Sequence, residues 1–108
     1  MGMAETSFDT REKEEEARFK HREELEFRVK ARRNKLLGLW AAQHLGFGQN
    51  EADAYAKELV ACALGAPNGV FEKLKEDFSS NGVTVSESQM REEMARLEKV
   101  ARVQVITE

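Results

Sequence analysis

The fold follows from residues 25–46, LEFRVKARRNKLLGLWAAQHLG, which combine apolar and basic side chains in a helical period. Apolar residues recur three and four positions apart, which is the spacing of one face of a helix. Gly46, directly after the last of them, is a favoured residue for ending a helix. The stretch therefore predicts a helix whose apolar stripe faces a core. The stripe consists of Val29, Leu36, Leu37, Trp40, Ala41 and Leu45.

Upstream of this stretch the helical pattern continues, but the side chains are mostly charged. Asp9 is a favoured N-cap, and Glu12 three residues later completes a capping-box pattern, so we expect a helix to begin there. Acidic residues precede basic ones by four positions, an arrangement that stabilises a helix in water. Apolar residues are sparse before Leu25. These spaced pairs are Glu14–Arg18, Glu16–Lys20, Glu24–Arg28 and Glu26–Lys30.

Downstream, glycine and proline divide the chain into three further helical stretches. The breaks lie at residues 46–48, 65–69 and 81–82. The last stretch has the clearest start, because Ser86 and Gln89 match a capping box. Val85 and Met90 occupy the flanking positions whose side chains staple the first turn. Three short connections therefore join four helices.

Strand signals are nearly absent, since Ile106 is the only isoleucine and no alternation of β-branched residues persists. The expected fold class is all-α, a small four-helix bundle with an N-terminal helical or partly disordered arm. We expect two units, a flexible N-terminal arm at residues 1–20 and the four-helix bundle at residues 21–108.

Charge is distributed unevenly along the chain. The net charge is −3, yet residues 17–35 hold eight basic and three acidic residues, and the segments on both sides are acidic. Such segmentation points to one end that faces a partner. No apolar run approaches the ~20 residues needed to span a bilayer, so we expect no direct membrane insertion.

Residues for catalysis or metal binding are few. Cys62 is the only cysteine, and His21 and His44 lie far apart in the sequence, so we expect no metal site. Phosphate-binding glycine loops, nucleophile elbows and paired zinc histidines are missing. The carboxylates fall into ladders with bases, as solvated charges do. We therefore expect a protein that is not an enzyme and needs no cofactor.

A basic collar at residues 28–35 leaves two interpretations open. Lys30, Arg32, Arg33 and Lys35 place four cations within six residues, a pattern that can contact phosphate backbones. Acidic flanks and the lack of interleaved aromatic residues oppose that interpretation, and Trp40 is better explained as a core anchor. Alternatively, the arginines pair with acids on neighbouring helices. We expect no nucleic-acid partner, and a small helical nucleic-acid-binding or adaptor protein that uses this collar is the alternative function.

Three phenylalanines stand on the charged part of the first helix. Phe8, Phe19 and Phe27 place apolar rings on a surface that otherwise favours water, which indicates that something covers them. We expect Phe27 to pack on the edge of the bundle. Phe8 is better explained as part of an amphipathic segment that docks into a groove on a partner.

Several motifs together resemble a known family. FDTREK at residues 8–13, FKH at residues 19–21 and the run LEFRVKARRNKLLGLWAA at residues 25–42 are similar to the zeta subunit of certain bacterial F-type ATP synthases. The string ARRNKLLGLWAA is the most specific part, and the resemblance continues through residues 51–60. It departs at residues 62–68, where the family more often has an acidic, glycine-containing loop.

The resemblance implies a natural inhibitor of ATP hydrolysis. In this family the N-terminal segment enters a catalytic alpha/beta interface beside the central rotor and blocks rotation in the hydrolytic direction. The implied partners are the catalytic alpha/beta head and the rotor of F-type ATP synthase. A monomer when free and a cytoplasmic location, peripheral to the inner membrane through the ATP synthase, are expected. Matching positions place the inhibitory arm at Phe8, Asp9, Arg11, Glu12, Lys13 and Phe19. We expect a secondary partner surface at Arg28, Lys30, Arg32 and Arg33.

Overall fold

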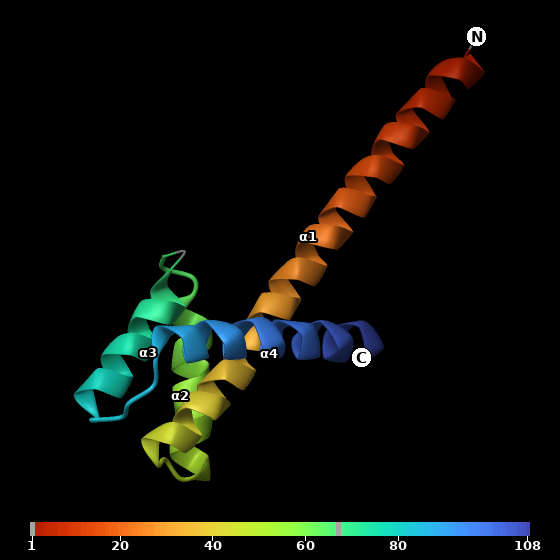
Figure 1. The fold of residues 1–108 in the computed structure, drawn as a ribbon. Coiled ribbons are helices and arrows are strands. Elements are labelled where there is room, and N and C mark those ends of the chain that lie inside the picture. Colours follow the sequence, from red (N-terminus) through yellow and green to blue (C-terminus); the bar gives the residue numbers. More distant parts are fainter. Residues whose placement is uncertain (1, 67) are drawn as a thin grey trace.

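The structure, a computed structural model, contains four helices and, within the residues that it describes, no strand (Figure 1). It describes the backbone of residues 2–66 and 68–108 and the side chains of residues 10–66 and 68–108. The predicted all-α, four-helix fold is confirmed. The helices are α1 (Gly2–Leu45), α2 (Gln49–Cys62), α3 (Gly69–Ser80) and α4 (Glu87–Thr107).

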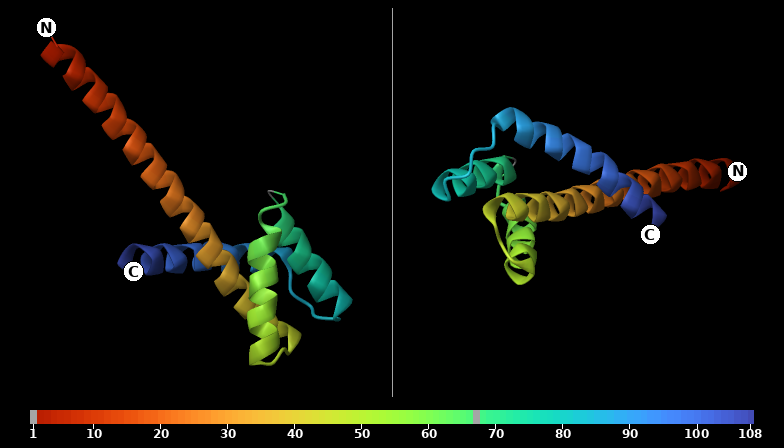
Figure 2. Two further views of the ribbon diagram at one scale, coloured as in Figure 1. Left: turned by 180° about the vertical axis from the view of Figure 1, so that it is seen from behind. Right: turned by 60° about the horizontal axis from the view of Figure 1, so that its bottom comes forward.

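Helix α1 is the axis on which the other helices assemble. Its 44 residues span ~66 Å at 1.5 Å per residue, and the molecule measures 71 × 25 × 21 Å. Helices α2 and α4 both pack on the C-terminal half of α1, and α3 lies mainly against α2 (Figure 2). Helix α4 crosses α1, while the N-terminal half of α1 projects away from the other three helices (Figure 1).

The main core lies where the four helices meet. Leu37 of α1, Leu59 of α2 and Leu74 of α3 are fully buried in one cluster. Helix α4 contributes Met90 and Leu97 to the same cluster. Each helix thus buries the apolar face that its sequence period predicts, and this burial supplies most of the driving force for folding.

The backbones of α1 and α2 come very close together at Gly38. A Cβ atom added to Gly38 would lie 2.6 Å from Cα of Ala56, well inside the ~3.5–4.0 Å at which carbon atoms pack. Ala56 is itself buried. Glycine lowers helix stability by about 1 kcal/mol relative to alanine, so a packing requirement explains its presence in mid-helix.

Helix α4 begins as the sequence predicts. The Gln89 backbone N–H donates to Oγ of Ser86 at 3.1 Å, and the Ser86 N–H donates to Oε1 of Gln89 at 3.0 Å. This capping box is confirmed, and it satisfies amide groups that a helix start otherwise leaves unpaired.

A polar contact reinforces the junction of α2 and α3. The Tyr55 hydroxyl donates to Oδ2 of Asp77 at 2.7 Å, and Lys73 Nζ lies 3.1 Å from the same carboxylate. Burial and the Asp77 carboxylate raise the pKa of Tyr55 above its ordinary value, so its hydroxyl keeps its proton and donates. These contacts therefore link α3 to α2 beside the main core.

Three expectations about α1 need correction. The helix begins at Gly2, so the start predicted at Asp9 is wrong and that residue lies inside the helix. The prediction that Phe27 packs on the bundle edge is also wrong, because its side chain is 62% exposed. Phe27 stands two positions before buried Val29, ~200° around the helix, and therefore points away from the core. Trp40 is only partly buried, at the edge of the main core.

Trp40→Ala should destabilise the protein by about 2–3 kcal/mol. The indole packs edge-to-face on Phe78 with ring centroids 5.9 Å apart and on His44 at 4.8 Å. Because the indole is only partly buried, the cost should lie at or below the lower end of the usual ~3–5 kcal/mol for removing a buried large aromatic. Urea unfolding followed by circular dichroism measures this change. A midpoint equal to that of the wild type would show that Trp40 does not support the core.

Deleting residues 1–18 should leave the remainder folded. The described side chains from residue 10 to residue 24 are exposed, and partial burial begins at Leu25. Removing helix that packs on nothing costs no core contact, so the thermal midpoint should shift by no more than about 3 °C. Thermal unfolding followed by circular dichroism tests this, and loss of a cooperative transition would show that the segment supports the bundle.

Candidate partner-binding site

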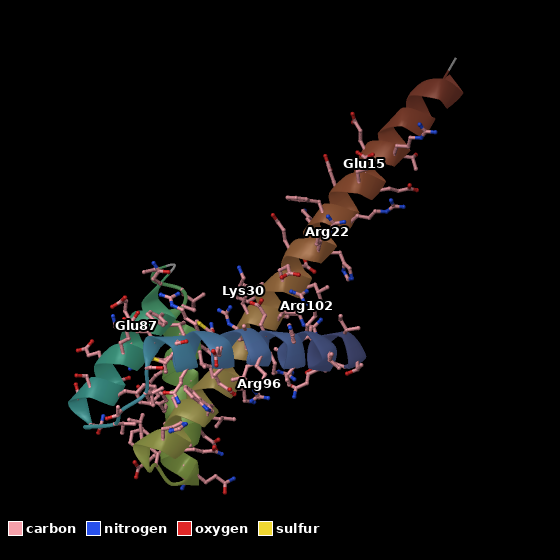
Figure 3. The ribbon with its side chains drawn as sticks, in the orientation of Figure 1. Glu15, Arg22, Lys30, Glu87, Arg96 and Arg102 are labelled. Carbon is pink, nitrogen blue, oxygen red and sulfur yellow. The ribbon has the colours of Figure 1, made fainter. Side chains whose placement is uncertain are left out.

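The projecting part of α1 is the first candidate site. Residues 10–24 form a helical rod with every side chain exposed, and charged side chains surround it on all sides (Figure 3). We call residues 10–24 the exposed rod. It carries Arg11, Glu12, Lys13 and Phe19 of the predicted arm. The side chains of Phe8 and Asp9 lie outside the described residues, so their predicted roles stay predictions.

Phe19 is the apolar feature of the exposed rod. Its side chain is 62% exposed although phenylalanine gains free energy from burial. Glu12 lies seven residues before it and therefore on the same side of the helix, whereas Arg11 and Lys13 point to other sides. A rigid charged rod with one uncovered ring offers no chemistry for bond making, but it suits docking on another protein.

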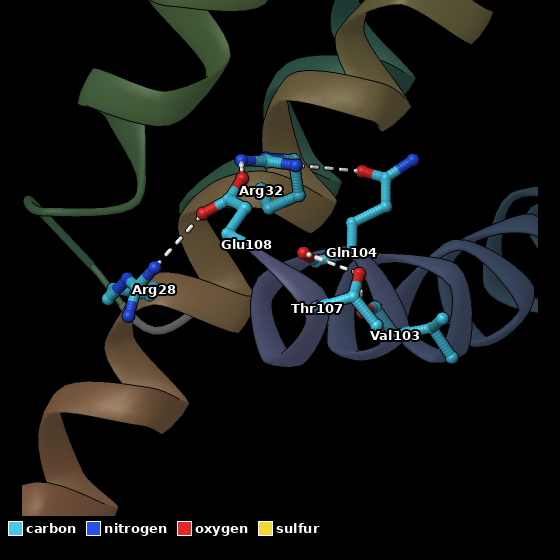
Figure 4. A network of polar contacts seen from close by, with 6 residues as sticks. All are labelled: Arg28, Arg32, Val103, Gln104, Thr107 and Glu108. Carbon is cyan, nitrogen blue, oxygen red and sulfur yellow. Dashed lines mark hydrogen bonds and ion pairs between the residues drawn. The ribbon is translucent and has the colours of Figure 1, made fainter.

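The second candidate is the basic collar, where the arginines are engaged within the molecule. Arg28 Nη2 lies 3.0 Å from Oε2 of Glu108, and Arg33 Nη1 lies 2.9 Å from Oε1 of Glu98. Arg32 pairs with the same Glu108 and donates to Oε1 of Gln104 at 3.0 Å (Figure 4). The interpretation that arginines of the collar pair with acids of a neighbouring helix is confirmed for Arg33, whose partner lies in α4, and Arg28 and Arg32 pair with Glu108 directly after that helix.

Lys30 differs from these arginines. No carboxylate lies within ion-pair distance of it in the described part of the chain, and it borders an open cleft of about 680 Å³. Other cations border the same cleft but are engaged: Lys75 pairs with Glu87 at 2.8 Å, and the Arg91 guanidinium lies over the Phe71 ring at 4.3 Å. The predicted secondary partner surface therefore consists of Lys30, which forms no close ion pair in the described part of the chain, and three arginines that pair with Glu98 or Glu108, and its role stays a prediction.

Some predicted pairs within α1 are replaced by contacts to α4. Glu26 was expected to pair with Lys30, but Arg102 donates to its two carboxylate oxygens at 2.6 and 3.0 Å. These hydrogen bonds lower the pKa of the Glu26 carboxyl below its ordinary value. Arg28 was expected to pair with Glu24 and pairs with Glu108. Arg102 and Glu108 are the residues that the sequence patterns did not single out, because no local spacing links positions 76 to 80 residues apart.

Among the described residues we find neither a candidate metal site nor a candidate membrane-spanning helix. No group of three His, Cys, Asp or Glu side chains gathers there. None of the helices, in the part of the chain that is described, is both long enough and apolar enough to cross a membrane.

Nucleic acid should bind weakly and without a steep dependence on salt. The collar arginines already neutralise acids of α4, so few cations are free to displace the counterions of a phosphate backbone. Fluorescence anisotropy with a generic duplex and a single strand measures this. A dissociation constant below about 1 μM at physiological salt, which is tighter than ordinary non-specific binding, would overturn the expectation.

Comparison with known protein families identifies the family of the whole chain. A family model described as ATPase inhibitor subunit zeta matches residues 5–104. The chain belongs to the ATPase inhibitor subunit zeta family. The match spans all four helices, including the exposed rod, so it confirms the resemblance of the sequence motifs for the bundle and for α1 together. No curated protein matches the chain.

Membership of the zeta family supports a role as an inhibitor of ATP synthase and therefore an interaction with that enzyme. It points to a regulatory protein rather than a catalytic one.

Proposed function

We propose that this zeta-family protein blocks ATP hydrolysis by inserting the N-terminal arm of α1 at a catalytic alpha/beta interface of F-type ATP synthase, beside the rotor. The observation that carries the proposal is the exposed rod. A helix that continues for fifteen exposed residues beyond its last buried contact gains nothing from the bundle, and a partner is the simplest reason for its length.

The arm is much narrower than the bundle that carries it. A single helix with its side chains is ~10–12 Å across, and the exposed rod reaches ~22 Å from the bundle. The molecule as a whole is 25 × 21 Å in its two shorter dimensions. The arm therefore fits a crevice between subunits that excludes the bundle, which stays outside and limits how far the arm enters.

Binding by a preformed helix has an energetic advantage. A segment that orders only on binding loses conformational entropy at that step, whereas a segment that is already helical loses less. Docking then depends on a few apolar anchors, because exposed ion pairs contribute only ~0–1 kcal/mol each. Phe19 supplies such an anchor, and Phe8 is the second one in our proposal.

The proposal also covers assembly and location. The inhibitor acts as a monomer whose arm contacts the catalytic alpha/beta head and the rotor. It is cytoplasmic and reaches the inner membrane only through the ATP synthase. An adaptor that uses the basic collar is the less favoured alternative, because three of its five cations already pair with Glu98 or Glu108.

Site-directed photocrosslinking tests where the arm goes. A photoreactive amino acid replaces Glu15 on the exposed rod or, as the matched control, Lys57 on the exposed side of α2. Each protein is mixed with the cognate enzyme during ATP hydrolysis and then illuminated. The Glu15 probe should capture an alpha or beta subunit, and the Lys57 probe should not capture the same site. Capture only through Lys57, or capture by the rod of subunits outside the catalytic head, would contradict the proposal.

A further inference from the structure

A small second core lies between α1 and the C-terminal half of α4. Val29 of α1 packs there with Ala101 and Val105 of α4, and all three are at most 4% exposed. Leu25 and Leu36 border this cluster. It is separate from the main core, whose last residue on α4 is Leu97. The two helices are therefore joined twice, once in the bundle and once beyond it.

Polar contacts surround this second core. On one side Arg102 holds both carboxylate oxygens of Glu26. On the other side Glu108 bridges Arg28 and Arg32, and Gln104 accepts a further hydrogen bond from Arg32 (Figure 4). We call the second core and these polar contacts the α1–α4 clamp. One exposed pair contributes little, but several contacts around a buried cluster act together.

The clamp lies where the exposed rod begins. The side chains of residues 10–24 are exposed, and the next residues of α1 toward the C-terminus are those that the clamp holds. Without the clamp, the first residues of α1 held by the rest of the molecule would be Arg33, which pairs with Glu98, and the buried Asn34. The unsupported part of α1 would grow by about eight residues, or ~12 Å of helix, and an isolated helix frays and bends more readily as it loses packing.

We propose that the α1–α4 clamp positions the N-terminal arm, by holding α1 straight and helical through residues 25–32 so that the exposed rod leaves the bundle in one direction. Its role in inhibition rests on the proposed function of the arm. Glu26, Arg102 and Glu108 are then positioning residues, which act through α1 and need not touch the target. A fixed direction preorganises the arm for its crevice, and preorganisation raises affinity by lowering the entropy lost on binding.

Charge-reversal variants distinguish a role in positioning the arm from a general effect on the stability of the protein. Arg102→Glu places a second carboxylate against that of Glu26, so the two groups repel each other. The double variant Glu26→Arg with Arg102→Glu restores a pair of oppositely charged side chains. Arg96→Glu is the matched control, because Arg96 lies on the same helix but pairs only with Glu93 of α4. Val105→Asp opens the clamp more strongly by placing a carboxylate in the second core, while the main core is left intact.

The direction of the arm is measured by the distance between two spin labels. The labels are placed at Glu15→Cys on the rod and Lys57→Cys on α2, in a Cys62→Ser background. The parent and Arg96→Glu should show one narrow distance distribution. Arg102→Glu and Val105→Asp should broaden it, and the double charge swap should narrow it again. Equal distributions in all variants, or broadening by Arg96→Glu as much as by Arg102→Glu, would overturn the proposal.

Inhibition of the cognate ATP synthase completes the test, with the same clamp variants in the unlabelled protein. Arg102→Glu should weaken inhibition about tenfold, the charge swap should recover most of it, and Arg96→Glu should match the wild type. A broadened distribution with unchanged potency would overturn the positioning role while leaving the proposed function standing. Failure of the wild type to inhibit would overturn the proposed function and, with it, the role of the clamp in inhibition.

Discussion

Gly38→Leu should destabilise the protein by about 3 kcal/mol or more, the largest stability effect that we expect from a single substitution. A side chain at this position must displace the backbone of Ala56, which a Cβ atom alone would approach to 2.6 Å. Forcing extra volume into a packed contact usually costs ~1–3 kcal/mol, and here the obstacle is a helix backbone that cannot rotate aside. Leucine is a better helix former than glycine, so the loss reports on packing rather than on helix propensity.

Urea unfolding of the wild type, Gly38→Leu and an exposed control measures this effect. Ala95→Leu introduces the same side chain on the exposed side of α4 and should change stability by less than about 0.5 kcal/mol. Because small domains are stable by only ~5–15 kcal/mol, the Gly38 variant should unfold at a clearly lower urea concentration. Midpoints that agree for all three proteins would show that α1 and α2 do not approach each other closely at this point.

Phe8→Ala should weaken inhibition of ATP hydrolysis about tenfold or more. An aromatic anchor buried in an interface is worth at least ~1.4 kcal/mol, which corresponds to one decade in affinity. The expectation comes from the sequence and from the family to which the chain belongs, because the side chain of Phe8 lies outside the described residues. Stability of the free protein should hardly change, since the side chains of residues 10–24, which lie between Phe8 and the bundle, are all exposed.

Phe27→Ala is the matched control for this prediction. Phe27 is on the same helix and is 62% exposed, but it lies beyond the arm, so its removal should leave potency within about twofold of the wild type. Titration of ATP hydrolysis by the cognate enzyme with the three proteins gives the comparison. Equal loss from both substitutions, or no loss from Phe8→Ala, would show that this ring is not a docking anchor.

Local features of the fold were predictable from the sequence because they depend on neighbours in the chain. The Ser86–Gln89 capping box is a three-residue pattern, and the structure contains both of its hydrogen bonds. The helical period likewise placed Leu37 on a buried face. The period tells which face of a helix is apolar, but it does not tell which helix covers that face.

Contacts between distant segments could not be predicted in this way. The α1–α4 clamp joins Glu26 to Arg102 across 76 positions, and the local i,i+4 rule favoured Lys30 as the partner of Glu26 instead. Phe27 was misplaced for a related reason, since hydrophobicity alone suggested burial although its position relative to Val29 turns it outward. Phe8 could be proposed from the sequence as an uncovered ring on a charged segment, but the charged arm residues could be proposed only through the family resemblance. The sequence of a charged helix is the same whether or not a partner covers it.

The most direct test of the central claim, that the arm of α1 inhibits while the bundle carries it, is one titration of ATP hydrolysis. The cognate membrane-bound enzyme is titrated with the full-length protein and with a variant that lacks residues 1–18, whose fold is first verified by its cooperative thermal transition. We predict that the full-length protein inhibits hydrolysis and that the folded, shortened protein has lost nearly all inhibition. Equal potency from the two proteins would contradict this account and place the inhibitory surface on the bundle.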